Sequence, residues 1–163
     1  MYTGNTMKRI TAQWPQPART KEAKRAALIS AGVITIMTVA QLFSFEKFIP
    51  LLNSFGLPSW LSGQAVAVTL VVAGVWALPF LLQMKLSVAM RWVSMVAGWI
   101  VAAVWVGLTL LINISGNIID NVGLLGASVT LIPGWWAVCV ALALCVLVAW
   151  ASWGQWPGRP VRK

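Results

Sequence analysis

Long apolar runs alternate along this chain with short stretches that contain its polar and charged residues. A helix that rises ~1.5 Å per residue needs about 20 apolar residues to cross the ~30 Å hydrocarbon core of a membrane. Four runs reach this length, and glycine or proline lies near several of their ends. We therefore predict four membrane-spanning helices, at residues 26–45, 65–84, 92–114 and 134–153.

The connection after the first predicted span contains a second periodic pattern. Phe48, Leu51, Leu52 and Phe55 recur at i, i+3, i+4 and i+7, which places them on one face of a short helix. Pro50 suits the first turn of such a helix. We expect this amphipathic helix to lie in the outer membrane interface and to cover one end of the bundle.

The few charged residues support this topology. Between positions 26 and 158 the only charged side chains are Glu46, Lys47, Lys85, Arg91 and Asp120. A charge at the bilayer centre costs several kcal/mol, so these residues mark the connections between spans. The overall composition, 60% hydrophobic and 9% charged, is also unlike that of soluble domains. The predicted fold is an all-α integral membrane four-helix bundle.

The basic residues predict the orientation of the bundle. Of the 12 Lys and Arg residues, all except Lys47 lie in the N-terminal segment, the second connection or the C-terminal tail. Short cytoplasmic segments retain Lys and Arg, so we expect a multi-pass protein with both termini in the cytoplasm. Residues 1–25 are predicted to be a flexible basic extension, residues 26–153 the transmembrane domain and residues 154–163 a basic tail. We attribute the net charge of +9 to topology and to contact with the lipid bilayer, not to nucleic-acid binding.

Polar residues gather at the predicted outer end of the bundle and form the candidate site. A polar side chain at the membrane edge is costly to insert, which makes such a group a functional hypothesis. The alternative is that Glu46 and Lys47 are only interfacial anchors. The candidate set, from two spans and their extensions, consists of Gln41, Glu46, Lys47, Asn113, Asn117 and Asp120, with Thr109 nearby.

The absence of histidine excludes several kinds of chemistry. Without it there is no His-ligated haem or metal site and no imidazole general base. The three carboxylates are dispersed, and Cys139 and Cys145 are six residues apart in one span, so we interpret both thiols as packing residues. We expect no metal site, no autonomous enzymatic activity and no evident cofactor, unless a bound quinone or a partner subunit supplies redox chemistry.

Small and aromatic residues within the spans predict how the helices pack. Ser94, Gly98 and Ala102 are spaced by four, as are Ala103 and Gly107, and such faces allow close helix approach. Trp76, Trp99 and Trp105 lie deep in their spans. We interpret these three indoles as packing residues of the bundle.

The segment QLFSFEKFIPLLNSFGLP, residues 41–58, resembles the DoxX-like membrane proteins, a group related to MauE. The family pattern is an apolar helix that ends in a small residue and a lysine, followed by an amphipathic piece that closes in Gly-Leu-Pro. Lys47 and Gly56-Leu57-Pro58 match this pattern, with Ser44 where glycine is often found. The resemblance implies a four-helix bundle in the bacterial cytoplasmic membrane, associated in some members with quinone or thiosulfate redox chemistry or with maturation of exported redox proteins.

Three functional hypotheses follow. A DoxX-like accessory component of quinone- or thiol-linked membrane redox chemistry predicts that the outer polar cluster opens onto a pocket. A structural or assembly subunit, partnered by another membrane protein or a second copy, predicts an exposed face of small residues. A small-solute transporter or channel subunit predicts polar residues that continue through the bundle.

Overall fold

The computed structural model describes residues 20–115, 119–153 and 155, and these residues form five helices and no strand. Four of the helices are long and apolar enough to cross a membrane, and the remaining one, α3, is short. The predicted all-α four-helix membrane bundle is confirmed. The helices are α2 (Lys21–Phe43), α3 (Phe45–Asn53), α4 (Gly63–Leu81), α5 (Val88–Ser115) and α6 (Trp135–Ser152).

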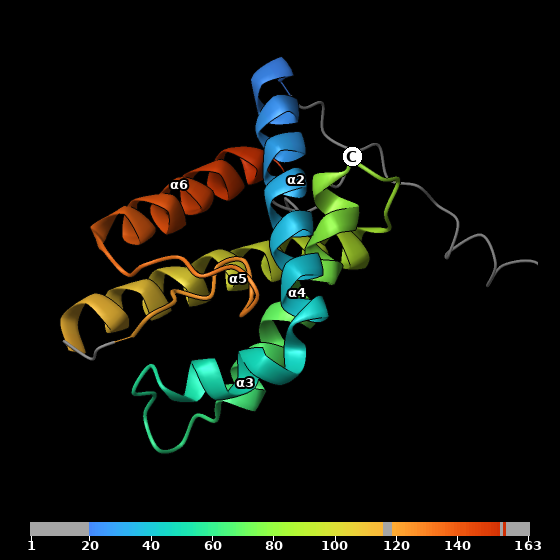
Figure 1. The fold of residues 1–163 in the computed structure, drawn as a ribbon. Helices are drawn as coiled ribbons and strands as arrows, with labels where there is room; N and C mark the ends of the chain where they lie inside the picture. The colour runs from blue at the N-terminus through green and yellow to red at the C-terminus, as the bar shows by residue number, and fades with distance from the viewer. Residues whose placement is uncertain (1–19, 116–118, 154, 156–163) are drawn as a thin grey trace, which may run out of the picture.

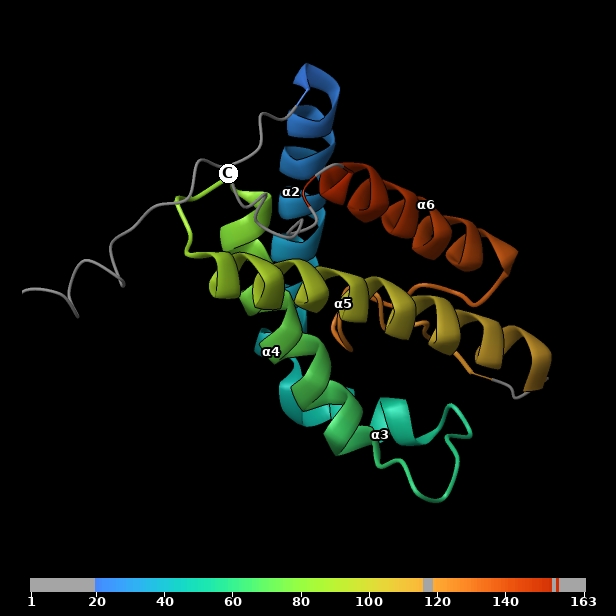
Figure 2. The ribbon, with the colours of Figure 1, turned by 180° about the vertical axis from the view of Figure 1, so that it is seen from behind.

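The four long helices pack in a ring. α4 contacts α2 and α5, and α6 contacts α5 and α2, while α3 packs on α4 (Figures 1 and 2). Both views show α5 and α6 side by side, crossing the direction of α2. The start of α2 and the α4–α5 connection lie at one end, which we call the basic end. α3 and the α5–α6 connection lie at the other, the α3 end.

Side-chain caps mark the starts of α2 and α4. The Thr20 hydroxyl oxygen accepts a hydrogen bond from the Ala23 N–H at 3.2 Å, and Ser62 accepts one from the Ala65 N–H at 3.2 Å. Because of the Thr20 cap, α2 begins at Lys21, five residues before the predicted span. Residues 21–25, which were predicted to belong to the N-terminal extension, are thus part of α2. Residues 1–19 and 156–163, which hold most of that extension and the tail, lie outside the described residues.

The predicted amphipathic helix is present as α3. Phe48, Leu52 and the following Phe55 are completely buried. Gly123 of the α5–α6 connection lies against Leu51, Phe48 and Phe55, and α3 also packs on α4. The apolar stripe therefore joins α3 to the rest of the bundle.

Close packing of α5 depends on small residues, as predicted. Ser94, Gly98 and Ala102 are all buried. Gly98 faces Ala77 of α4 and Val148 of α6, so its missing side chain allows both helices to approach. By contrast, Gly107 lies on an exposed face of α5 with nothing within 4 Å of the position of a side chain.

A hydrogen-bonded bridge also ties α5 to α4. The Ser94 hydroxyl accepts a hydrogen bond from the backbone N–H of Phe80 and donates one to the carbonyl of Trp76. Pro79 lies directly before Phe80 and has no N–H to donate. The bridge thus supplies polar contacts where a proline removes one from the helix.

Candidate functional site

The α5–α6 connection folds back along α5 toward α2 as an irregular segment, drawn in orange in Figure 1. Asn121 organises its backbone. The side-chain oxygen of Asn121 accepts hydrogen bonds from the N–H groups of Gly123 at 3.0 Å and Leu131 at 3.1 Å, and its amide nitrogen donates to the Gly126 carbonyl at 3.3 Å. A further bond joins the Val122 N–H to the Leu131 carbonyl at 2.9 Å. One buried amide therefore satisfies three backbone groups of a segment that lacks regular structure.

Ser44, between α2 and α3, anchors this connection to the bundle. Its hydroxyl oxygen accepts a hydrogen bond from the Ala127 N–H at 2.9 Å and donates to the Ala40 carbonyl at 2.9 Å. Gly126 lies directly against Ser44 and the Ala40 carbonyl, with a φ of +69°. A side chain at this position would require both an unfavourable backbone conformation and displacement of α2.

Gln41 makes the second anchor from α2. Its side chain is only 1% exposed, and its amide nitrogen donates a hydrogen bond to the Leu124 carbonyl at 3.4 Å. The bond crosses 83 residues of sequence. Gln41 thus satisfies a buried carbonyl of the connection, which gives it a structural contact at the α3 end.

The other members of the predicted polar cluster occupy different surroundings. Glu46, Lys47 and Asp120 are exposed. Asn113 is half-buried and donates to the carbonyls of Thr109 at 2.8 Å and Gly134 at 3.4 Å, which joins the end of α5 to the start of α6. Asn117 lies outside the described residues. The cluster is therefore divided into buried amides that bond to backbone carbonyls and charged groups that face outward.

Sequence analysis missed Ser44 and Asn121 as the main polar residues of this end. Neither residue belongs to the predicted polar cluster, although Asn121 directly follows Asp120 in the sequence. A usable signal was present, because an asparagine followed closely by two glycines, Gly123 and Gly126, is typical of a tight irregular segment held by a side chain.

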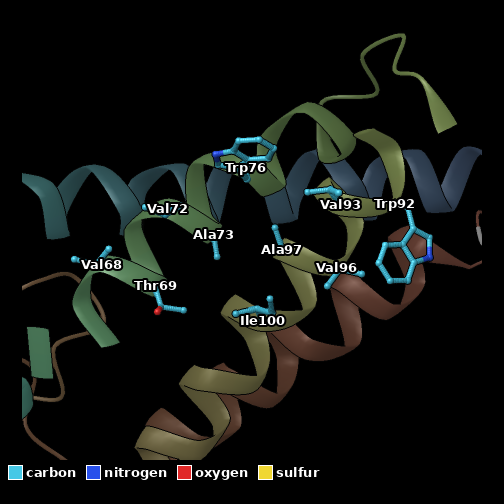
Figure 3. A pocket seen from close by; sticks show the side chains of 10 residues that line it. All are labelled: Val68, Thr69, Val72, Ala73, Trp76, Trp92, Val93, Val96, Ala97 and Ile100. Atoms are coloured by element: carbon cyan, nitrogen blue, oxygen red, sulfur yellow. The ribbon is translucent and has the colours of Figure 1, made fainter. Parts of the chain in front are cut away.

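A second candidate site is an apolar groove between α4 and α5, shown in Figure 3. The groove has a volume of about 540 Å³, within the ~300–1,000 Å³ common for small-molecule sites. Side chains of the two helices face one another across it, with Thr69 toward one end and Trp92 at the other. The lining residues are Val68, Thr69, Val72, Ala73 and Trp76 of α4 and Trp92, Val93, Val96, Ala97 and Ile100 of α5.

The polar atoms of this groove define the chemistry that it can offer. None of the ten lining residues is charged. The indole N–H groups of Trp76 and Trp92 are hydrogen-bond donors, and the Thr69 hydroxyl can donate or accept. Trp76, Trp92 and Thr69 are all exposed on the surface of the helix pair. A neutral, largely apolar molecule that carries carbonyl acceptors would complement this lining.

The predicted packing role of the deep tryptophans holds for two of the three. Trp105 is completely buried, and the half-buried Trp99 donates a hydrogen bond from its indole nitrogen to the Ser152 hydroxyl at 3.3 Å. Trp76 is different, because it is 46% exposed and lines the groove. Its position on the outer face of α4 was not recognisable from an apolar sequence without polar residues to mark the faces.

The described residues were also considered for metal ligands and reactive thiols. Among the described residues, no group of three or more His, Cys, Asp or Glu side chains could hold a metal ion. Cys139 is exposed on α6 and Cys145 is half-buried, and both are free thiols. The prediction that both cysteines are packing residues is wrong for Cys139, because its side of α6 faces away from the bundle.

A comparison of the chain with protein-family models, curated proteins and solved structures found no significant match, so the likeness of residues 41–58 to DoxX-like proteins stays a prediction from the sequence.

Proposed function

We propose that this small polytopic membrane protein is a non-catalytic accessory component of membrane redox chemistry that binds an isoprenoid quinone in the groove between α4 and α5. The groove itself is the observation that supports the proposal. Its walls are apolar side chains of two helices long enough to span a membrane, so they suit an isoprenoid chain. The resemblance to DoxX-like proteins, some of which are linked to quinone chemistry, is a second support.

The two tryptophans indicate where the quinone ring would bind. Quinone carbonyl oxygens accept hydrogen bonds. The indole N–H groups of Trp76 and Trp92 can donate hydrogen bonds but cannot accept them. Trp92 lies in the second turn of α5, near the basic end, where indoles favour the boundary between headgroups and hydrocarbon. The ring would then lie near this boundary, and the isoprenoid chain would extend toward Thr69.

Binding can be tested with purified protein in lipid nanodiscs that contain a short-chain ubiquinone. Quinone titration should quench tryptophan fluorescence with saturation. Val72→Phe and Val93→Phe would fill the groove from its two walls, because these side chains are 50% and 42% exposed, and should weaken binding about tenfold or more, or ~1.4 kcal/mol. Val140→Phe on α6, at a site 44% exposed and outside the groove, is the matched control. Equal quenching in all variants would reject the groove as the quinone site.

A structural or assembly subunit is the second candidate, and one observation favours it. Ala103 and Gly107 lie one turn apart on an exposed face of α5, and Gly107 has open space around it. Small residues of this spacing let a second transmembrane helix approach closely. Gly107→Leu should then abolish co-purification of a partner helix or a second copy, whereas a quinone accessory role predicts that quinone binding survives this substitution.

A further inference from the structure

Cationic side chains gather at the basic end of the bundle. Lys21, Lys24 and Arg25 are exposed in the first turns of α2, and Lys85 is exposed in the α4–α5 connection. The Gln83 side-chain amide donates a hydrogen bond to the Lys24 carbonyl at 3.3 Å, which holds this connection beside the start of α2. Basic residues from two distant parts of the sequence therefore share one end of the bundle.

The connection that holds Lys85 has a defined backbone. Gln83 is the only non-glycine residue with a positive φ, +60°, in the part of the chain that the structure describes. Its N–H bonds to the Phe80 carbonyl at 3.1 Å, and the Met84 N–H bonds to the Pro79 carbonyl at 3.0 Å. These bonds close the last turn of α4 in the manner of a left-handed helix cap. Lys85 thus directly follows a turn whose backbone is held by two hydrogen bonds.

Arg91 has an unsatisfied donor at this end. It lies one helical turn before Ser94, which bonds to the last turns of α4, so Arg91 is on the same side of α5 and closer to the basic end. The residue is half-buried, and its Nε atom is buried without a hydrogen-bond partner among the described residues. An unpaired buried donor of a charged group is costly, so the guanidinium group would gain from a nearby anion. Because Nε is enclosed by the protein, an anion from outside would meet the terminal nitrogens of this half-buried side chain.

Two of the three acidic side chains lie at the opposite end of the bundle from Arg91. Asp120 follows the end of α5, and Glu46 lies in α3, so both are at the α3 end. Glu22 lies at the basic end, in the first turn of α2, where its exposed side chain is outnumbered by the exposed Lys21, Lys24 and Arg25. The basic end therefore combines an excess of positive charge with a guanidinium group whose Nε atom has no partner in the described part of the chain.

We propose that the basic end binds the phosphate of an anionic phospholipid, with Arg91 as the principal ligand and Lys85 and the start of α2 as supporting charges. Guanidinium groups bind phosphate through parallel, charge-assisted hydrogen bonds. Basic pockets between transmembrane helices are suited to anionic headgroups, and Lys or Arg residues near an anionic leaflet strengthen the attraction. Trp92, next to Arg91, places the site at the depth where headgroups meet hydrocarbon.

The test uses the full chain in mild detergent with equal amounts of phosphatidylglycerol and phosphatidylcholine, and measures bound lipid by native mass spectrometry. The wild type should retain phosphatidylglycerol in preference to phosphatidylcholine. Arg91→Gln should reduce this preference about fivefold or more, or ~1 kcal/mol, and Lys85→Gln should reduce it less. Lys47→Gln, which removes a basic residue at the α3 end, is the matched control and should leave the preference unchanged.

Several results would overturn the proposal. Equal retention of the two lipids by the wild type would show that no anionic site exists. An unchanged preference for phosphatidylglycerol in both Arg91→Gln and Lys85→Gln would show that the lipid does not bind at the basic end. An equal loss of preference in Lys47→Gln would lead to the same conclusion. An acidic polypeptide that co-purifies with the wild type and excludes lipid would identify a protein ligand instead. Arg91→Lys keeps the charge but not the planar guanidinium group, and it should lose part of the preference for phosphatidylglycerol. This second variant distinguishes loss of the phosphate ligand from misfolding of Arg91→Gln.

Discussion

The Oγ atom of Ser94 in α5 lies 3.0 Å from the backbone nitrogen of Phe80 in α4, directly after Pro79. The same hydroxyl donates to the Trp76 carbonyl. Ser94→Ala would remove both bonds from a buried position and should lower the free energy of unfolding by about 1–3 kcal/mol. The apparent Tm of the purified protein in detergent measures this effect. Ser59→Ala, in an exposed connection, should leave the Tm unchanged, and an equal Tm for Ser94→Ala would show that the bridge does not stabilise the α4–α5 contact.

Gly126 should tolerate no side chain. A Cβ atom there would lie 2.6 Å from the Ala40 carbonyl oxygen and would also meet the Ser44 hydroxyl, at a φ of +69°. Gly126→Ala should therefore destabilise the protein by at least ~1 kcal/mol from backbone strain, with more from the clash with α2. Gly107→Ala is the control, because open space surrounds this helical glycine and alanine favours the helix by up to ~1 kcal/mol. The two Tm shifts should have opposite signs.

Asn121 should control the order of the α5–α6 connection. Asn121→Ala removes three hydrogen bonds to backbone groups, whereas Asn121→Asp keeps the acceptor for Gly123 and Leu131 and loses only the donor to the Gly126 carbonyl. Proteolysis between residues 119 and 133 should thus be fastest in Asn121→Ala and intermediate in Asn121→Asp. Ser128→Ala, at an exposed position in the same segment, should match the wild type. Equal cleavage rates in all four proteins would contradict the role of Asn121.

The predicted orientation can be tested by thiol labelling of intact cells. In a chain with Cys139 and Cys145 replaced by alanine, Ser59→Cys reports on the connection after α3, and Ser87→Cys reports on the connection at the basic end. A membrane-impermeant maleimide should label Ser59→Cys in intact cells and Ser87→Cys only after permeabilisation, because basic connections are retained in the cytoplasm. The reverse pattern would invert the topology.

The membrane fold follows from the sequence because apolar runs of fixed length leave few alternatives. The exact start of α2 could not be predicted from the sequence. The charged residues between 21 and 25 interrupt the apolar run, whereas the Thr20 cap lets the helix begin before that run. The contact of Gln41 with Leu124 joins residues far apart in the chain, and no local pattern encodes it. The groove depends on how α4 and α5 diverge, and its valines and alanines resemble those of every other span.

The groove between α4 and α5 has a consequence for how any ligand would be controlled. Its walls belong to two membrane-spanning helices, and its lining is almost wholly apolar, so a ligand would enter sideways from the bilayer. Occupancy would then depend on the mole fraction of that ligand in the lipid and on its competition with acyl chains, not on its concentration in water. A protein that bound its ligand in this way would respond to the composition of its membrane.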